Sequence, residues 1–207
     1  MPEPPDFTMP PFFVYIVESN NIHEIMDGKS EGAALQKVLN FSGVRVKYHT
    51  SLGKQDLPIQ LGRAPGYTYE MQAFPVLHIS AHGSLRGIQL TSGELVTWRE
   101  LAELLRPLHH FSGSNYLLCL SACEGLGSVQ VALATPDLPL FGVVGTSKVV
   151  DWSDNVVGYV AFYHLLQKGK TIREAVQGMR AASGHDTYAF VHGPTAVDVF
   201  KSMFPPR

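Results

Sequence analysis

The sequence predicts one α/β domain of three layers, in which a mostly parallel sheet is covered by helices on both faces. Two observations lead to this fold class: short apolar segments typical of buried strands recur along the chain, and helical patterns separate most of them. Parallel strands need long crossover connections, and the helices that provide them cover both faces of the sheet. A length of 207 residues fits one such domain.

The expected strands are short runs of apolar and β-branched residues, at 12–18, 44–50, 76–81, 115–122, 140–146 and 188–192. Helices are expected at 30–39, 97–108, 127–134, 152–167 and 171–182, three of them starting at the capping residues Ser30, Thr97 and Thr171. A surface hairpin is expected within 87–97, and His109 and His110 are expected in solvent after the second helix. Residues 51–72 show no clear period, so we expect an irregular segment that contributes to the rim of the site.

Charge and composition exclude several classes of function. The 16 basic and 18 acidic residues give a net charge of −2, which leaves no basic field for a nucleic-acid backbone. No apolar run approaches the roughly 18 residues of a membrane span, so we expect no membrane partner. The two cysteines, Cys119 and Cys123, lie too close along one strand to form a disulfide, which favours a reducing, cytoplasmic location.

The first eleven residues differ in composition from the rest of the chain. The segment 1–11 is rich in proline and has neither the basic nor the apolar region of a signal peptide. We therefore expect a disordered or extended N-terminal arm, followed by a single domain over 12–207.

Two of the predicted strands end in reactive side chains. His82 and Gly83 follow the strand at 76–81, and Cys123 follows the strand at 115–122. Ligands of open parallel sheets bind beyond the carboxyl ends of the strands, and neighbouring strands are about 4.8 Å apart. The sequence therefore predicts that His82 and Cys123 can reach the same substrate carbonyl as a catalytic dyad.

This pairing suits nucleophilic catalysis, although each residue also has a structural interpretation. A cysteine nucleophile gains from a neighbouring imidazole or a helix N-terminus, and a helix is expected near Gly127. Gly83 would let a substrate backbone approach closely and could donate its N–H to an oxyanion. Taken alone, Cys123 also fits a small buried apolar residue, and His82 fits a hydrogen-bonded loop residue.

The segments LHISAHG (77–83) and LLCLSACEG (117–125) resemble the catalytic segments of caspase-like cysteine peptidases, the group of caspases, metacaspases, separases and CHAT domains. The resemblance is closest to CHAT domains, because it continues over 143–182, and it covers roughly 76–194. It implies a caspase-like sandwich with His82 as the catalytic histidine, Cys123 as the nucleophile and the Gly83 amide as an oxyanion donor. Two departures are that Glu124 follows the cysteine where CHAT domains commonly have a short polar residue, and that no helical repeat or sensor domain is evident.

Three acidic residues are candidates for substrate binding. Asp151 and Asp154 follow the strand at 140–146, where the family builds its substrate pocket, and Glu124 follows the nucleophile. A buried carboxylate there would favour Arg or Lys before the cleaved bond. Alternatively, Ser153 or Asp154 caps the helix that starts there, and Glu124 is an exposed charge at the rim.

The sequence favours neither a metal nor a cofactor. His78 and His82 share one face of a strand, but no third metal ligand is evident. The glycines at 125 and 127 lack the third glycine of a dinucleotide-binding loop, since Gln130 occupies that position. A serine hydrolase is disfavoured because no G-x-S-x-G motif occurs.

The leading functional hypothesis is a thiol protease, a hydrolase that cleaves a protein or peptide partner through an acyl-enzyme on Cys123. By resemblance, such a domain serves as an effector in bacterial stress, antiviral defence or cell death, under the control of a regulatory partner or a small-molecule activator. The alternative is a non-catalytic module that uses the caspase-like fold to bind a partner or a nucleotide-like signal.

Overall fold

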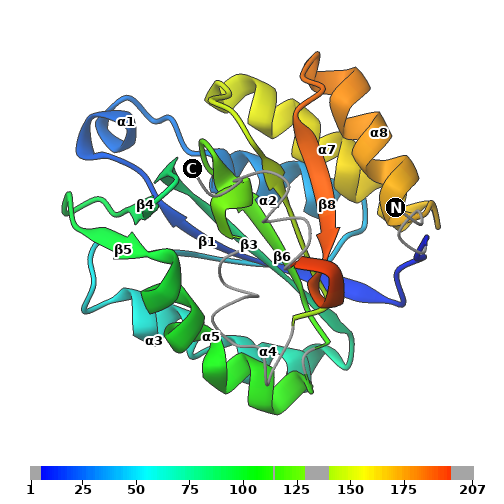
Figure 1. Ribbon diagram of the computed structural model, residues 1–207, viewed down its shortest axis with the longest axis horizontal. Coiled ribbons are helices and arrows are strands. Elements are labelled where there is room, and N and C mark those ends of the chain that lie inside the picture. The colour runs from blue at the N-terminus through cyan, green and yellow to red at the C-terminus, as the bar shows by residue number, and fades with distance from the viewer. Residues whose placement is uncertain (1–5, 114, 129–139, 197–207) are drawn as a thin grey trace.

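The computed structural model describes residues 6–113, 115–128 and 140–196, and it confirms the predicted α/β class (Figure 1). The main sheet has the strand order β2-β1-β3-β6-β7-β8. Its members are β1 (Phe12–Ser19), β2 (Val46–Thr50), β3 (Phe74–Ser84), β6 (Leu117–Ser121), β7 (Gly142–Thr146) and β8 (Tyr188–His192). Neighbouring strands are parallel, except that β8 runs antiparallel to β7.

Helices cover both faces of this sheet and form the outer two layers. In Figure 1, α2 (Glu31–Phe41), α7 (Trp152–Gln167) and α8 (Ile172–Ser183) lie on one face, and α3 (Leu57–Leu61), α4 (Ala64–Met71) and α5 (Trp98–Ser112) lie on the other. The short helix α1 (Ile22–Met26) follows β1 directly, and the β4 (Gly87–Gln89) and β5 (Leu95–Thr97) hairpin extends from the end of β3. The three-layer arrangement is therefore the one expected of a covered parallel sheet.

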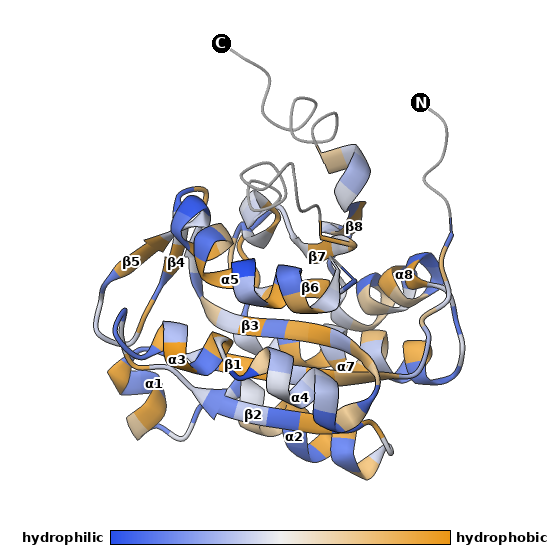
Figure 2. Ribbon diagram, turned by 90° about the horizontal axis from the view of Figure 1, so that it is seen from below, coloured by the Kyte–Doolittle hydropathy of each residue, from blue (hydrophilic) through white to orange (hydrophobic). Residues whose placement is uncertain are grey.

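Side chains along the central strands point alternately to the two faces of the sheet, so the interior has two hydrophobic cores. On β3, Leu77 and Ile79 belong to the core under α3 to α5, whereas Val76 belongs to the core under α2, α7 and α8. Both β1 and β6 are buried along their whole length. Figure 2 shows hydrophobic residues along much of β1 and β3 in the middle of the molecule. Burial on both faces is the reason why these strands read as nearly continuous apolar runs.

The predicted helix starts at Ser30, Thr97 and Thr171 are confirmed. Each side chain accepts a hydrogen bond from a backbone amide of the first turn. Thr97 and Thr171 also form reciprocal capping boxes with the glutamates three residues later. These N-capping hydrogen bonds set the residues at which α2, α5 and α8 begin.

The prediction of an irregular segment at 51–72 is wrong, because this segment contains α3 and α4. Each helix has a proline in its first turn, where no backbone donor is lost, and each is too short to show a clear period. Leu57, Leu61 and Ala64 are buried in the core beside α5, away from the rim of the site.

Two further expectations need correction or lie outside the described residues. His109 is buried inside α5, which continues past Pro107, and its ring contacts the Tyr116 hydroxyl at 3.0 Å. The helix expected at 127–134 lies mostly outside the described residues, and the described part is a single 3₁₀ turn, η1 (Gly125–Ser128). This short turn does not supply the helix N-terminus expected near Cys123.

The described part of the N-terminal arm, residues 6–11, is extended and packed on the domain. The Ile172 amide donates to the Phe7 carbonyl at 2.8 Å, and Thr8 pairs with Thr171. The Phe7 ring packs edge-on against Phe141, with ring centroids 5.0 Å apart. Within the described ranges, no helix combines the length and the apolar character needed to cross a membrane.

The burial of α3 predicts a contrast between two neighbouring residues of that helix. Leu57 is 1% exposed, whereas Ile59 is 59% exposed. We expect Leu57→Ala to lower the free energy of unfolding by about 2 to 5 kcal/mol and Ile59→Ala to change it by less than about 0.5 kcal/mol. Urea unfolding monitored by circular dichroism measures both, and equal effects would contradict the packing of α3 on the core.

Candidate active site

The pairing of β3 with β6 brings the two predicted catalytic residues to the same place. Along this parallel pair, His78 is opposite Cys119 and Ser80 is opposite Ser121. His82 lies two residues after Ser80 on β3, and Cys123 lies two residues after Ser121, beyond the end of β6, so both residues are at the same end of the paired strands. Both residues line a single pocket beyond the carboxyl end of β6.

The pocket is formed by the ends of β3 and β6 and by the segment that leads into α7. Its remaining lining residues are Ala81, Ala122, Val149, Val150, Asp151, Trp152 and Asn155. Gly83 lies where the two strand ends come closest: a Cβ at this position would be 2.5 Å from the Cys123 carbonyl oxygen and 3.2 Å from its amide nitrogen. A side chain would therefore push the segments of His82 and Cys123 apart.

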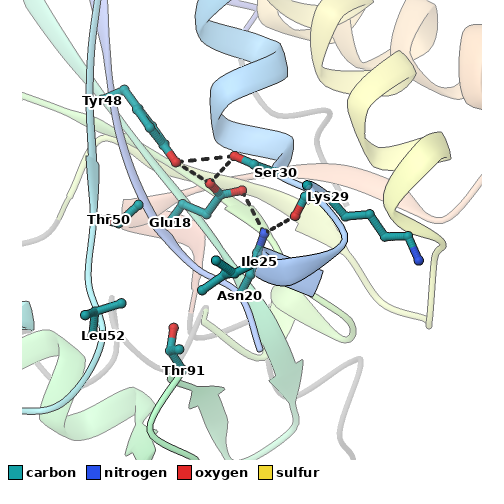
Figure 3. A pocket seen from close by; sticks show the side chains of 10 residues that line it. Glu18, Asn20, Ile25, Lys29, Ser30, Tyr48, Thr50, Leu52 and Thr91 are labelled. Atoms are coloured by element: carbon teal, nitrogen blue, oxygen red, sulfur yellow. Dashed lines mark hydrogen bonds between the residues drawn. The ribbon is translucent and has the colours of Figure 1, made fainter. Parts of the chain in front are cut away.

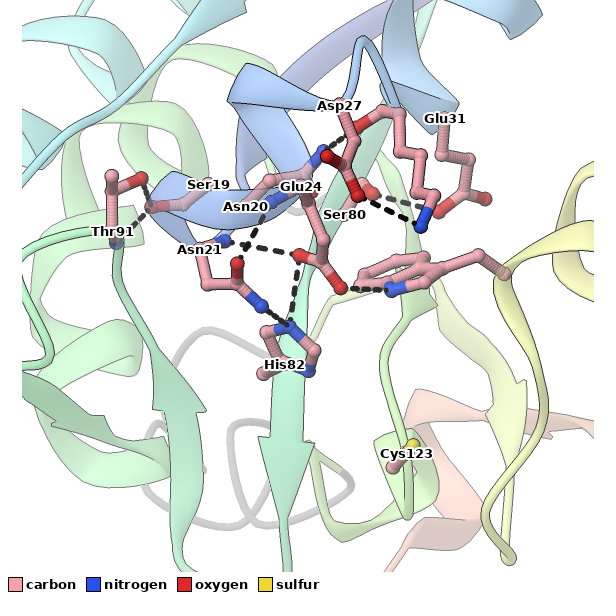
Figure 4. A network of polar contacts seen from close by, with 12 residues as sticks. Ser19, Asn20, Asn21, Glu24, Asp27, Glu31, Ser80, His82, Thr91 and Cys123 are labelled. Atoms are coloured by element: carbon pink, nitrogen blue, oxygen red, sulfur yellow. Dashed lines mark hydrogen bonds and ion pairs between the residues drawn. The ribbon is translucent and has the colours of Figure 1, made fainter.

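His82 is oriented by a carboxylate that sequence analysis did not identify. Its Nε2 atom is 3.0 Å from Glu24 Oε2 and 3.1 Å from Asn21 Nδ2 (Figure 4). A carboxylate can only accept and the Asn21 Nδ2 group can only donate, so the two contacts favour opposite tautomers; the tautomer that pairs with Glu24 carries its proton on Nε2. This tautomer leaves the lone pair on Nδ1, which is the arrangement a general base needs.

Glu24 is itself held in place from two sides. Its second oxygen, Oε1, accepts a hydrogen bond of 2.7 Å from the Trp152 indole, and Asn21 and Glu24 form the capping box of α1. The Trp152 ring also packs edge-on against the His82 ring at 5.3 Å. The pattern Asn21-x-x-Glu24 is a capping signal that could have identified α1, although nothing local connects it with His82.

Cys123 is the more accessible of the two cysteines. Cys119 is fully buried, and burial raises the pKa of its thiol to about 12, so it stays protonated and unreactive. The Cys123 thiol is partly exposed and donates to the Val150 carbonyl at 3.9 Å. Among the described residues, His82 and Cys123 share a pocket without a hydrogen bond between them.

The three acidic candidates occupy different positions. Asp151 lines the pocket and is the N-cap residue of α7, where its side chain makes no capping hydrogen bond. Asp154 is not among the lining residues and contacts His185 at 2.9 Å. Glu124 has a left-handed backbone with φ of 54°, and its carboxylate accepts from the Leu85 amide at 3.1 Å. Only Asp151 is therefore placed to meet a substrate in this pocket, and neither Ser153 nor Asp154 is the N-cap.

A buried polar cluster lies beneath the pocket, two residues back along each strand. Ser80 and Ser121 both donate to the Glu31 carboxyl group, at 2.6 to 2.7 Å, from the first turn of α2. Burial raises the pKa of Glu31 to about 8, and burial lowers the pKa of nearby His78 to about 3. His78 in turn contacts the Tyr163 hydroxyl at 2.8 Å. The cluster joins β3, β6 and α2 directly under the reactive residues.

The raised pKa of Glu31 predicts a dependence of stability on pH. The folded chain keeps this proton up to about pH 8, whereas an unfolded glutamate loses it near pH 4.5, so the free energy of unfolding falls as the pH rises between these values. His78 offsets a small part of this fall, because the unfolded histidine loses its proton near pH 6.5 whereas the folded one is already neutral there. Between pH 6.5 and 8 we expect a decline of about 1 to 2 kcal/mol that Glu31→Gln abolishes.

Denaturant unfolding at several pH values measures this decline in both proteins. Asp27→Asn is the matched control, because Asp27 is an exposed carboxylate, and this variant should keep the decline. Equal pH dependence in the wild type and in Glu31→Gln would contradict the burial of a protonated Glu31.

The described residues contain no group of three or more His, Cys, Asp or Glu side chains suited to hold a metal. Comparison of the chain with protein-family models and with curated proteins found no match. The function is therefore argued from the residues of this site.

Proposed function

We propose that this chain is a cysteine endopeptidase of the caspase-like type, with Cys123 as the nucleophile and His82 as the general base. The observation that carries the proposal is the shared pocket of His82 and Cys123 at the carboxyl ends of neighbouring parallel strands. The inert environment of Cys119 supports the assignment of the nucleophile to Cys123.

The reaction begins with transfer of the thiol proton from Cys123 to His82 Nδ1. The sulfur attacks the carbonyl carbon of the scissile peptide bond, and the carbonyl oxygen becomes an oxyanion. His82 then gives its proton to the leaving amine as the C–N bond breaks, which leaves a thioester on Cys123. Water, deprotonated by His82, attacks the thioester, releases the acid and restores the thiol.

Glu24 supports both proton transfers by holding the ring and stabilising the imidazolium. In this proposal the ring donates from Nε2 to Glu24 before the reaction, and the charge of Glu24 favours the protonated ring after the first transfer. The indole of Trp152 keeps the second oxygen of Glu24 occupied, which prevents the carboxylate from turning away. Glu24 is thus a positioning residue, and the site is a Cys–His–Glu arrangement.

The Gly83 amide serves as the oxyanion donor in this proposal, as the family resemblance implies. The close approach of Gly83 to the Cys123 backbone supports this role, because a donor must lie near the carbonyl that the sulfur attacks. Asp151 in the pocket favours a basic residue before the cleaved bond.

The biological setting rests on the resemblance to CHAT domains. We propose a cytoplasmic effector protease that acts on a protein partner in bacterial stress, antiviral defence or cell death. A separate regulatory partner or a small-molecule activator would raise a basal activity that the isolated chain already has.

Incubation of the full chain with a mixed peptide library, with products identified by mass spectrometry, tests the mechanism. We expect cleavage by the wild type, none above background for Cys123→Ala or His82→Ala, and a decrease of roughly a hundredfold in kcat for Glu24→Gln. Asp27→Asn is the matched control for charge, because Asp27 follows α1 but pairs with Lys29 at the surface. Cleavage that survives Cys123→Ala, or wild-type protein without any cleavage, would contradict the proposal.

A further inference from the structure

A second pocket lies between the ends of β1 and β2 and the helix α1, and it shares no residue with the pocket of His82 and Cys123 (Figure 3). The cavity has a volume of about 210 Å³ and is open to solvent, which leaves room for a small organic molecule. Ile25 and Leu52 provide apolar walls, and both are substantially exposed. Glu18 and Asn20 provide polar groups at the inner end.

Glu18 brings a carboxylate charge to this pocket while being only 2% exposed. Its two oxygens accept hydrogen bonds from four neutral donors: the Ser30 and Tyr48 hydroxyls, the Gly32 amide and the Asn20 side-chain amide. The Gly32 amide belongs to the first turn of α2, so the helix end offsets part of the charge. In the described part of the chain, no Lys, Arg or His forms an ion pair with Glu18.

Asn20 has a buried acceptor without a partner. The residue is 5% exposed, and its Nδ2 group donates both to Glu18 and to the Lys29 carbonyl, which fixes the orientation of the amide. Its Oδ1 atom has no hydrogen-bond partner and is closed to solvent, so a ligand reaches it only when side chains at the pocket wall move. A buried acceptor of this kind loses its water without replacement, so a ligand that supplies an N–H would recover that loss.

We propose that this pocket binds a primary ammonium group carried on a small apolar body. The ammonium would donate to Asn20 Oδ1 and place its charge beside Glu18, while the apolar part packs between Ile25 and Leu52. An anion would meet the Glu18 charge, and a ligand without a donor would leave Asn20 unpaired. The ammonium of Lys29 does not fill this role, because it points away from the pocket and pairs with Asp27 at 3.1 Å.

Titration of the full ¹⁵N,¹³C-labelled chain, followed by NMR, tests the proposal without any assay of peptidase activity. The probe is 3-methylbutylamine. Two matched ligands carry the same alkyl chain: 3-methylbutan-1-ol has no charge, and 4-methylpentanoate has a negative charge. We expect saturable shifts of the Asn20 side-chain amide and the Ile25 methyl group with the amine below about 10 mM, and roughly tenfold or weaker binding of the alcohol and the carboxylate.

Two further amines distinguish the sources of such a group. Leucinamide presents the amine of a peptide N-terminus, and Nα-acetyl-lysine methylamide presents a lysine side chain. The tightest binder among leucinamide, Nα-acetyl-lysine methylamide and 3-methylbutylamine shows whether the ammonium group belongs to a peptide N-terminus, a lysine side chain or a free small amine.

Leu52→Trp and Ile59→Trp form a matched pair of variants, because both replace an exposed aliphatic residue and only Leu52 lines the pocket. We expect Leu52→Trp to weaken amine binding at least tenfold and Ile59→Trp to leave it unchanged. Three results would overturn the proposal: no saturable shift with any of the amines, equal binding of the amine, the alcohol and the carboxylate, or equal binding by the two variants.

Discussion

The in-register parallel pairing of β3 with β6 determines what can happen at this site. Because side chains alternate along a strand, this pairing sets two successive levels on the same face, His78 with Cys119 and then Ser80 with Ser121. It also brings His82 and Cys123, just beyond the last paired residues, to the same end of the sheet. A slip of one residue in either strand would send its reactive residue to the opposite face, under α5. Large apolar side chains on that opposite face, such as Leu118 and Leu120, oppose such a slip because they would lose their core.

The same alternation explains why polar groups are buried under the site. Glu31 reaches from α2 to both serines and thereby ties the two strands together at the level just below the reactive pair. A carboxyl group that stays protonated avoids the cost of burying a charge and can still receive both hydroxyl hydrogens. The cluster therefore supports the geometry of the pocket without adding an uncompensated charge beneath it.

The helix α1 lies between the two pockets: it orients His82 in the first and lines the second. Its capping residue Asn21 and its Glu24 contact His82, while Ile25 on the same short helix lines the second pocket. None of its residues is buried, so α1 is held mainly by its polar contacts with His82 and Trp152. The orientation of the imidazole thus depends on a helix with little apolar packing of its own.

The strands, the long helices and the pairing of His82 with Cys123 were predictable from sequence, because each depends on local periodicity, capping or strand order. The helices α1, α3 and α4 were not predicted, because each is eight residues or shorter and so shows no reliable period. The helix expected at 97–108 continues to Ser112 in the structure, with Leu108 and His109 buried. The role of Glu24 was not predictable, since it depends on contacts with residues 58 and 128 positions away.

Whether His82 activates Cys123 is measured by the rate at which iodoacetamide alkylates each cysteine at neutral pH. Cys119, protonated and buried, serves as the internal reference within the same molecule. The account predicts fast, selective modification of Cys123 in the wild type and a decrease of at least about tenfold in that rate in His82→Ala. Equally slow modification of both cysteines, or a Cys123 rate that is unchanged in His82→Ala, would contradict it.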